Sequence, residues 1–346
     1  MKGKIKPSYG LHRVKLSEII PLAMPFTINL SVSTFCNFNC CYCYHSLPEH
    51  ILSSKNFVKQ NMSMDMFNLA ISQIKNFPNK LKTTFLFGWG EPLCNKYLPS
   101  MIKIIKQENI TEKIEIVTNG ALLSKDTIDK LIDSGLDIIR ISLQGITAEK
   151  YNKICSAKII MEDFIENIRY LYNNKKQCQI FVKTADISLD KNEEEKFYDL
   201  YKDICDRMFI EKIMPSAKGV DYSKIIKMDN STTTDAWGNI HETRLVCPLC
   251  FYTLNVLPNG DVYPCSCAFE DPAGLGNIIN TPLNEIWNGP LHRDFLIMQL
   301  KKQRMNNPVC KYCINPDASA KQEDELDNDA DIILTKLQQN SLVCNK

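Results

Sequence analysis

The sequence predicts an α/β protein with a parallel sheet, open or curled into a barrel, followed by a small cysteine-rich domain. Short apolar segments rich in β-branched residues alternate with amphipathic helical patterns over residues 26–215, as in repeated strand–helix units. After residue 240 the pattern changes to closely spaced cysteines between Gly and Pro turns. Two different structural units are therefore expected in this chain of 346 residues.

Six segments of the first unit have the composition of strands, and a helical pattern separates each from the next. The predicted strands are residues 26–33, 83–89, 113–120, 137–145, 179–187 and 208–215. The predicted helices are residues 63–77, 96–108, 125–135, 161–174 and 192–206. In the second unit, Asn259 and Gly260 predict a tight turn that brings residues 252–257 and 261–265 together as a hairpin.

Shifts in composition divide the chain into five parts. The predicted parts are a polar lead-in (1–25), the strand–helix region (26–215), a Ser/Thr-rich linker (216–240), the cysteine-rich domain (241–320) and an acidic, helical tail (321–346). The acidic stretch of the tail is interpreted as a solvated helix face or terminus.

Charge and hydropathy narrow the possible partners. The 41 basic residues are balanced by 40 acidic ones, so we expect neither nucleic acid nor a membrane surface as a partner. The apolar stretch at 19–33 contains two prolines and Asn29 and lacks a small-residue cleavage site, which argues against a signal peptide or a membrane span. A small molecule or a peptide is the expected substrate, and the cytoplasm is the expected location.

Four motifs stand where predicted strands end. They are TFCNFNC (34–40), GWGEP (88–92), TNG (118–120) and SLQG (142–145). In parallel α/β folds the carboxyl ends of the strands meet at one edge, and functional groups collect there. We therefore expect all four motifs to face one mouth of the sheet.

The first motif begins a cluster of cysteines with the spacing C-x3-C-x2-C, formed by Cys36, Cys40 and Cys43. Thiolates at such spacing suit an iron–sulfur cluster or zinc. Three thiolates on a four-iron cubane leave one iron free to bind a small molecule. Cys41 is left out because adjacent residues at a strand end point apart. A zinc knuckle, which needs four protein ligands, or a set of buried core thiols is the alternative.

The segment TFCNFNCCYCYH (34–45) resembles the signature of the radical S-adenosylmethionine (SAM) superfamily, with its cysteine spacing and an aromatic residue, Tyr42, before the third cysteine. GWGEP is similar to the Gly-Gly-Glu-Pro motif of that family, with Trp89 in place of one Gly, and TNG and SLQG match further strand-end motifs. The resemblance implies a partial (β/α)6, TIM-like barrel that binds a [4Fe–4S] cluster and SAM.

The same resemblance implies roles for individual residues around SAM. Carbonyl groups of Trp89 and Gly90 would receive the methionyl ammonium group, and Glu91 would organise the turn. Ser142 would contact the SAM carboxylate or ribose, and Gln144 the ribose. The remaining expected SAM contacts are Tyr42, against the adenine, and Asn119. One departure concerns an Arg of the family that reaches the SAM carboxylate: Cys155 stands in its place, and Lys153 and Lys158 are the candidate replacements.

The second cysteine-rich segment is similar to the SPASM/twitch extension of radical SAM enzymes. PNGDVYPC (258–265), GNI…IWN (276–288) and CKYC (310–313) carry this resemblance. It implies the shorter twitch form, an α+β domain with one auxiliary [4Fe–4S] cluster. The expected ligands are Cys247, Cys265, Cys310 and Cys313, with Cys250 as a competitor of Cys247 and Cys267 as a spare thiol. The alternative is a zinc site built from two C-x2-C pairs, although their separation exceeds the ~15–20 residues of common zinc pairs.

The family chemistry implies reductive cleavage of SAM to a 5′-deoxyadenosyl radical, which removes a hydrogen atom from a substrate C–H bond. We expect a two-electron oxidation of a sugar-like or aminocyclitol-like alcohol, or of a peptide side chain, with the auxiliary cluster as electron acceptor and a flavodoxin or ferredoxin as electron donor. A radical SAM epimerase and a peptide-crosslinking maturase are the alternatives, and Cys94 is the best candidate for a hydrogen-donating thiol. A non-catalytic zinc-binding interaction protein is the alternative from a different class.

Overall fold

A computed structural model describes residues 3–7, 13–54, 57–226, 234–265, 274–319 and 321–344. Its strands form a ten-stranded sheet in the order β1-β7-β6-β5-β4-β3-β2-β8-β9-β10. Pairing is parallel from β1 through to β8 and antiparallel between β8, β9 and β10. The strands are β1 (Lys4–Ile5), β2 (Thr27–Leu30), β3 (Thr83–Phe85), β4 (Ile114–Thr118), β5 (Ile138–Leu143), β6 (Gln179–Ala185), β7 (Arg207–Glu211), β8 (Thr253–Val256), β9 (Asp261–Tyr263) and β10 (Gly276–Asn277).

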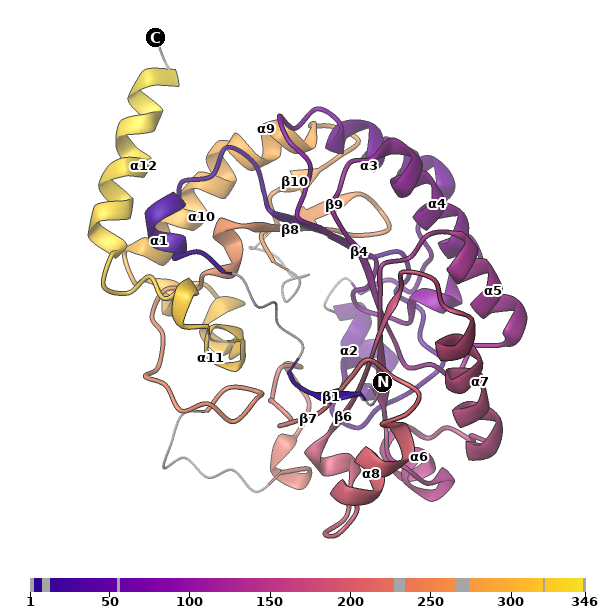
Figure 1. Ribbon diagram of the computed structural model, residues 1–346. Coiled ribbons are helices and arrows are strands. Elements are labelled where there is room, and N and C mark those ends of the chain that lie inside the picture. The colour runs from indigo at the N-terminus through magenta and orange to yellow at the C-terminus, as the bar shows by residue number, and fades with distance from the viewer. Residues whose placement is uncertain are drawn as a thin grey trace.

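The predicted strand–helix region is confirmed, with β2 to β7 at the six predicted strands. All five predicted helices are present, and they follow one another around the outer side of the sheet (Figure 1). Serine caps fix two of their starts, because the hydroxyls of Ser63 and Ser124 accept hydrogen bonds from the first turns. These five helices are α3 (Met64–Ile74), α4 (Leu98–Glu108), α5 (Lys125–Asp133), α7 (Met161–Asn174) and α8 (Glu194–Tyr201).

The inner and outer faces of the sheet differ in polarity. On β5, Ile139 and Ile141 are fully buried in the core shared with the outer helices. Arg140 and Ser142 alternate with them and are only partly buried. Since side chains alternate across a strand, Arg140 and Ser142 lie on the inner face together with Ile138, so β5 presents polar groups to the inside of the barrel.

Further helices complete the barrel and build the second unit. One of them, α6, follows the SLQG motif directly and was not predicted. The set comprises α1 (Leu16–Ile19), α2 (Glu49–Ser54), α6 (Ala148–Cys155), α9 (Leu283–Asn288), α10 (Pro290–Leu300), α11 (Asn315–Ala318) and α12 (Ala330–Cys344).

The predicted hairpin of the cysteine-rich region is present as β8 and β9, with Gly260 in the left-handed region at φ +88°. The hairpin also extends the barrel sheet, because β8 pairs in parallel with β2. Gln73 on α3 fastens this region further: its amide donates to Ile278 O (2.8 Å) and accepts from Leu283 N (2.9 Å). The barrel and the cysteine-rich region therefore share one sheet, and side chains of β8, β9 and α9 join the core of the barrel.

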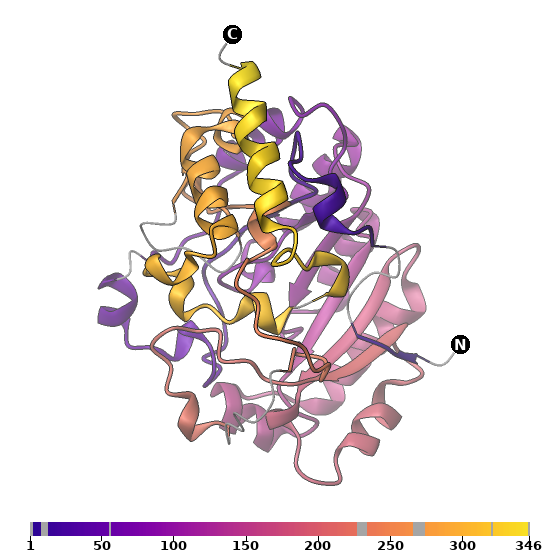
Figure 2. The same cartoon turned by 90° about the vertical axis from the view of Figure 1, so that its left-hand side faces the viewer.

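The two chain ends have more structure than their composition predicts. The lead-in supplies β1 to the sheet edge, and α1 packs in a second core with α10 and α12 (Figure 2). The interpretation of the tail acids as solvated is wrong for Asp324, which is buried and paired with Arg13. Among the described residues, no helix combines the length and apolarity needed to cross a bilayer.

Candidate active site

The three cysteines of the first cluster lie in the loop after β2, where their thiols influence one another. Burial, followed by the proximity of Glu91 and Cys43, raises the pKa of Cys36 to about 12. A hydrogen bond with Cys155, followed by burial, raises the pKa of Cys40, and burial raises that of Cys43. Thiols that resist ionisation on their own are stabilised as thiolates by a bound cation. Because Cys36, Cys40 and Cys43 lie close enough to interact electrostatically within one short loop, this donor set fits a metal cluster.

The C-terminal end of α6 holds the cysteine loop in place through backbone hydrogen bonds. The backbone N–H groups of Asn39 and Cys41 donate to the carbonyls of Cys155 (3.0 Å) and Ile154 (2.8 Å). The Cys155 thiol donates to Tyr151 O at 2.9 Å. The residue that replaces the family's Arg is thus a buried support of the loop. Sequence reasoning could have suspected this helix from the capping pattern at Thr147, whose hydroxyl accepts from Lys150 N.

The GWGEP motif lies directly against the cysteine loop. Glu91 N donates to Phe35 O at 2.7 Å. A Cβ atom on Gly90 would approach Phe35 O to 2.4 Å, so only glycine allows this contact. The Trp89 carbonyl contacts His45 Nε2 at 2.6 Å. His45 was not predicted as a site residue, although it adjoins the cysteine motif in the sequence.

Glu91 joins GWGEP to the TNG motif at the end of β4. Its buried carboxylate accepts from Thr118 Oγ1 (2.6 Å), Asn119 N (2.7 Å) and Leu93 N (3.1 Å). Burial raises the pKa of Glu91 to about 7 against the opposing effect of these three donors. The Asn119 amide in turn donates to Asn37 Oδ1 at 2.7 Å, back in the cysteine loop. Three of the four motifs are therefore locked together by hydrogen bonds.

The SLQG motif joins the same mouth through Gln144, whose Oε1 accepts a hydrogen bond from the Tyr42 hydroxyl. Gln144 Nε2 also donates to Ser142 O at 3.2 Å. The convergence predicted for the four strand ends is thus present in the structure. Lys153 and Lys158 are both exposed. The lysine in register with Ser142 is instead Lys183 on β6.

Charged side chains cross the inner face of the sheet below this mouth. Arg140 on β5 pairs with Glu115 on β4, and Lys183 on β6 pairs with Glu211 on β7 at 2.6 Å. All four are inward-facing by strand register. The alternation of polar residues in the predicted strands was the signal for them.

The segment after β7, predicted as a linker, packs on the cysteine loop. The Tyr222 hydroxyl donates to Tyr42 O at 2.8 Å and accepts from Ala217 N at 3.0 Å. Tyr222 and Ala217 also share a buried apolar cluster with Tyr44. Residues 216–226 therefore form part of the wall around the site.

A second cysteine site is enclosed in the C-terminal region. Five cysteines line one cavity together with apolar side chains that include Phe295 and Val309: Cys247, Cys250, Cys265, Cys310 and Cys313. Burial raises the pKa of Cys247 and Cys250, and it raises that of Cys310 to about 12. All four expected ligands and the competitor Cys250 thus meet at one place. Cys267 lies outside the described residues.

Two side chains that were not predicted organise this second site. Gln299, fully buried on α10, donates to Cys310 Sγ (3.6 Å) and accepts from Cys247 N (3.2 Å). The buried Arg304 donates to Cys310 O (3.0 Å) and to Cys313 O. No spacing in the sequence marks either residue, because each acts through tertiary contacts.

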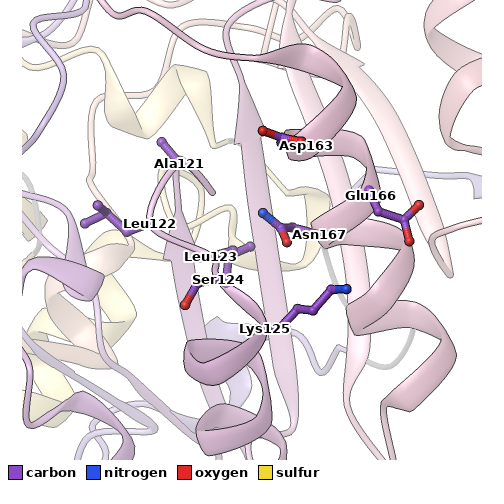
Figure 3. A pocket seen from close by; sticks show the side chains of 8 residues that line it. All are labelled: Ala121, Leu122, Leu123, Ser124, Lys125, Asp163, Glu166 and Asn167. Atoms are coloured by element: carbon purple, nitrogen blue, oxygen red, sulfur yellow. The ribbon is translucent and has the colours of Figure 1, made fainter.

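Other candidate groups lie apart from the two cysteine sites or at their edge. Cys94 lies near Glu91 and Cys36, and burial raises its pKa to about 11. A groove between the starts of α5 and α7 contains none of the predicted site residues (Figure 3). In the described part of the chain, no three His, Cys, Asp or Glu side chains are spaced to hold a single metal ion.

A parallel barrel with three clustered cysteines and three interlocked strand-end motifs at its mouth defines the class of iron–sulfur enzymes that bind a small cofactor at a cubane. The chain belongs to the radical SAM superfamily, whose family model matches residues 30–204. A second model, described as an iron–sulfur cluster-binding domain (SPASM), matches residues 247–314. The protein is therefore a radical SAM enzyme whose barrel region binds a [4Fe–4S] cluster and SAM, and the SPASM region binds iron–sulfur. The zinc and non-catalytic alternatives are wrong for that reason.

Solved structures of low sequence identity share this fold. BtrN in complex with AdoMet and 2-DOIA has a TM-score of 0.55 at 17% identity, covering 87% of this chain and 97% of that chain. SuiB of Streptococcus suis bound to S-adenosylmethionine has a TM-score of 0.60 at 16% identity, covering 86% and 74%. Native anSMEcpe with bound AdoMet has a TM-score of 0.55 at 16% identity, covering 92% and 98%.

Curated relatives match part of the chain. The GTP 3′,8-cyclase of Nautilia profundicola is 27% identical over 58% of this chain and 61% of its own length. The probable GTP 3′,8-cyclase of Methanococcus aeolicus is 31% identical over 38% and 42%. These matches thus span between about two fifths and three fifths of the relatives' length.

Proposed function

We propose that the protein removes a hydrogen atom from a C–H bond of a small polar substrate and completes a two-electron oxidation. The favoured substrate is a sugar-like or aminocyclitol-like alcohol, and a peptide side chain is the second possibility. Two ion pairs on the inner face of the sheet, Arg140–Glu115 and Lys183–Glu211, are the observation that favours a sugar-like or aminocyclitol-like alcohol. A lumen with paired charges offers hydrogen bonds of both senses to hydroxyl and amino groups.

The mouth supports the expected positions of the first cluster and SAM. Cys36, Cys40 and Cys43 would hold the [4Fe–4S] cluster, which with SAM supplies one-electron reductive cleavage to methionine and a 5′-deoxyadenosyl radical. The carbonyls of Trp89 and Gly90 would accept from the methionyl ammonium group. The bridge from Glu91 to Thr118 and Asn119 would keep those carbonyls in place.

The remaining SAM contacts come from the other two strand ends. Ser142 and Gln144 would bind the carboxylate and ribose, with Asn119 beside them, and Tyr42 would lie along the adenine. The hydrogen bond between Tyr42 and Gln144 supports a joint role, because it fixes two of these groups before SAM arrives.

The second site would hold an auxiliary [4Fe–4S] cluster through Cys247, Cys265, Cys310 and Cys313, with Cys250 as the competing ligand. Enclosure by apolar side chains and full protein ligation would make this site an electron acceptor and not a SAM site. We further propose that the chain divides into the five predicted parts, and that a flavodoxin or ferredoxin is the reductant. The proposed location is the cytoplasm, where thiols stay reduced.

The test is anaerobic turnover of reconstituted enzyme with reductant, SAM and separate candidate substrates: aminocyclitols, a cysteine- or serine-containing peptide, and GTP. With an aminocyclitol as substrate, we expect equal amounts of 5′-deoxyadenosine and of the product formed by two-electron oxidation of the alcohol. Solvent deuterium in an otherwise unchanged product would indicate epimerisation, and a crosslinked peptide would indicate a maturase. Conversion of GTP alone would replace the proposed function with the activity for which the curated relatives are named.

A further inference from the structure

A buried amide on β8 has no hydrogen-bond partner among the described residues. Asn255 is fully buried, and neither its Oδ1 nor its Nδ2 atom has a partner there. Its neighbours Leu254 and Val256 belong to the core under the outer helices, so Asn255 faces the inner side of the sheet. Most buried polar groups in folded proteins are paired, because an unpaired one lowers stability. An unpaired amide on the inner face points to a ligand that completes its hydrogen bonds.

The hydroxyl group of Ser31, on the same face, is also without a partner in the part of the chain that the structure describes. Ser31 follows β2 directly and is fully buried. Asn29 is in register with Asn255, and Ser31 N donates to Val256 O at 2.9 Å. Since Leu30 belongs to the outer core, Asn29 and Ser31 face inward with Asn255. We name Asn29, Ser31 and Asn255 the neutral wall.

The neutral wall lies between the two cysteine sites. A Cβ atom on Gly88 of GWGEP would meet Ser31 Oγ at 2.2 Å, so this hydroxyl lies directly against the motif expected to bind SAM. Asn255 is in register with Tyr263, whose ring packs against Cys265 of the five-cysteine cavity. A group bound by the neutral wall would therefore lie between the proposed SAM and auxiliary cluster sites.

Charge divides the strands around the inner face into two parts. Strands β2, β3 and β8 contain no charged residue, whereas β4 to β7 carry the ion pairs Arg140–Glu115 and Lys183–Glu211. An amide and a hydroxyl together provide hydrogen-bond donors and acceptors. Adjacent hydroxyl groups offer both functions in return, whereas a carboxylate offers only acceptors and an ammonium group only donors. The neutral wall thus fits the uncharged edge of a polyol.

We propose that Asn255 and Ser31 bind adjacent hydroxyl groups of a cyclic polyol substrate. The inference rests on the proposed function and specifies its substrate. An aminocyclitol would bind with its hydroxyl-bearing edge against the neutral wall and its amino group toward the ion pairs. Because both side chains are buried, a substrate without matching hydroxyl groups leaves them unpaired, and the neutral wall selects against it.

The first test measures binding of scyllo-inosamine, an aminocyclitol with adjacent hydroxyl groups, by anaerobic calorimetry. The holoenzyme carries SAM but no reductant, so that no turnover occurs. Asn255→Leu and Ser31→Ala should each bind at least about tenfold more weakly than wild type, since each leaves a ligand hydroxyl unpaired. Asn173→Leu, at an exposed position of α7, should bind as wild type does. Cyclohexylamine, which has the amino group but no hydroxyl, should not distinguish the four proteins.

The second test separates ligand binding from a structural role by urea unfolding of ligand-free protein. Asn255→Leu replaces an unpaired buried amide with apolar atoms of similar volume. Its unfolding midpoint is therefore expected to equal or exceed that of wild type. If Asn255→Leu is less stable, the affinity of Ser31→Ala, which lacks only one oxygen atom, decides. A lower midpoint in Asn255→Leu together with wild-type affinity in Ser31→Ala would overturn the proposal.

Absence of scyllo-inosamine binding to wild type would contradict the proposal, as would equal affinity in wild type and both variants. Binding of a serine-containing peptide that Asn255→Leu abolishes would identify a peptide site in place of the polyol site. Weakened scyllo-inosamine binding in both variants, without oxidised product in the turnover assay, would support this site and reject the proposed oxidation. Oxidised product with unchanged affinity in both variants would reject this site alone.

Discussion

The two cysteine sites use the same side chain in opposite surroundings. The first has three cysteines in a loop, and hydrogen bonds join that loop to GWGEP, TNG and SLQG at the strand ends. The second has five cysteines in one cavity, closed by Phe295, Gln299 and other side chains of its own region. An incomplete set of sulfurs beside converging polar groups suits a cluster that binds a ligand. A complete and enclosed set suits a cluster that only exchanges electrons.

Removal of one cysteine from the three-cysteine site should have the largest effect on activity. Cys36→Ala is expected to abolish 5′-deoxyadenosine formation and to lower iron from about eight atoms per chain to about four, as one of two cubanes is lost. Iron analysis and chromatography of the SAM products check this. Cys178→Ala, which removes a buried core thiol, should change neither quantity. Full iron content in Cys36→Ala would show that the three-cysteine site holds no cluster.

Glu91 should make the stability of the mouth depend on pH. The folded-state pKa of about 7 lies above the ordinary value of 4.5. Its stabilising contribution is therefore fully present below pH 4.5 and is lost as the pH rises through 7. The shift corresponds to at most about 3 kcal/mol. Urea unfolding of SAM-free protein between pH 5 and 8 should show this decline.

The Glu91→Gln variant provides the control for that experiment, because its side chain does not titrate. Its stability should vary less with pH than that of wild type over the same range. Parallel curves for the two proteins would show that Glu91 does not carry the effect.

Gln299 should tune the second site without affecting the first. Gln299→Leu removes a hydrogen bond to Cys310 Sγ, which is expected to lower the reduction potential of the auxiliary cluster because hydrogen bonds to sulfur favour the reduced state. A bond of ~1 kcal/mol corresponds to roughly 40 mV for one electron. A redox titration followed by electron paramagnetic resonance measures it. The exposed Gln303→Leu is the matched control, and an equal shift in both variants would refute the assignment.

Tyr222 should have the smallest effect, confined to the mouth. Tyr222→Phe removes the hydroxyl that bonds Tyr42 O and Ala217 N, at a cost of about 1 kcal/mol. Affinity for SAM is expected to fall several-fold, by calorimetry, with iron content unchanged. Unaltered affinity would mean that residues 216–226 only cover the loop.

The sequence predicted what local patterns encode. Strand–helix alternation located β2 to β7 and their five helices, and motifs at strand ends predicted the mouth where Glu91, Asn119 and Gln144 meet. The parallel pairing of β8 with β2 was not predictable, because a short strand does not specify its partner across more than 200 residues of chain. The pairing of β1 with β7 was missed for the same reason, since a strand of two residues carries almost no pattern.

At the two sites, too, some residues were predictable from local patterns and others only from the folded structure. The cysteines were predictable because their spacing is a property of the chain. His45, Gln299 and Arg304 act on carbonyl or sulfur atoms through folded contacts that spacing does not encode. The Lys183–Glu211 pair was visible only as polar residues alternating within strands, whose facing direction the fold decides.

The contrast between an open and a closed site is tested most directly by electron paramagnetic resonance of reduced holoenzyme before and after addition of SAM. We predict two cluster signals, of which SAM changes one, and that one is missing from Cys36→Ala protein. A SAM-dependent change in the signal that Cys36→Ala retains would contradict this prediction.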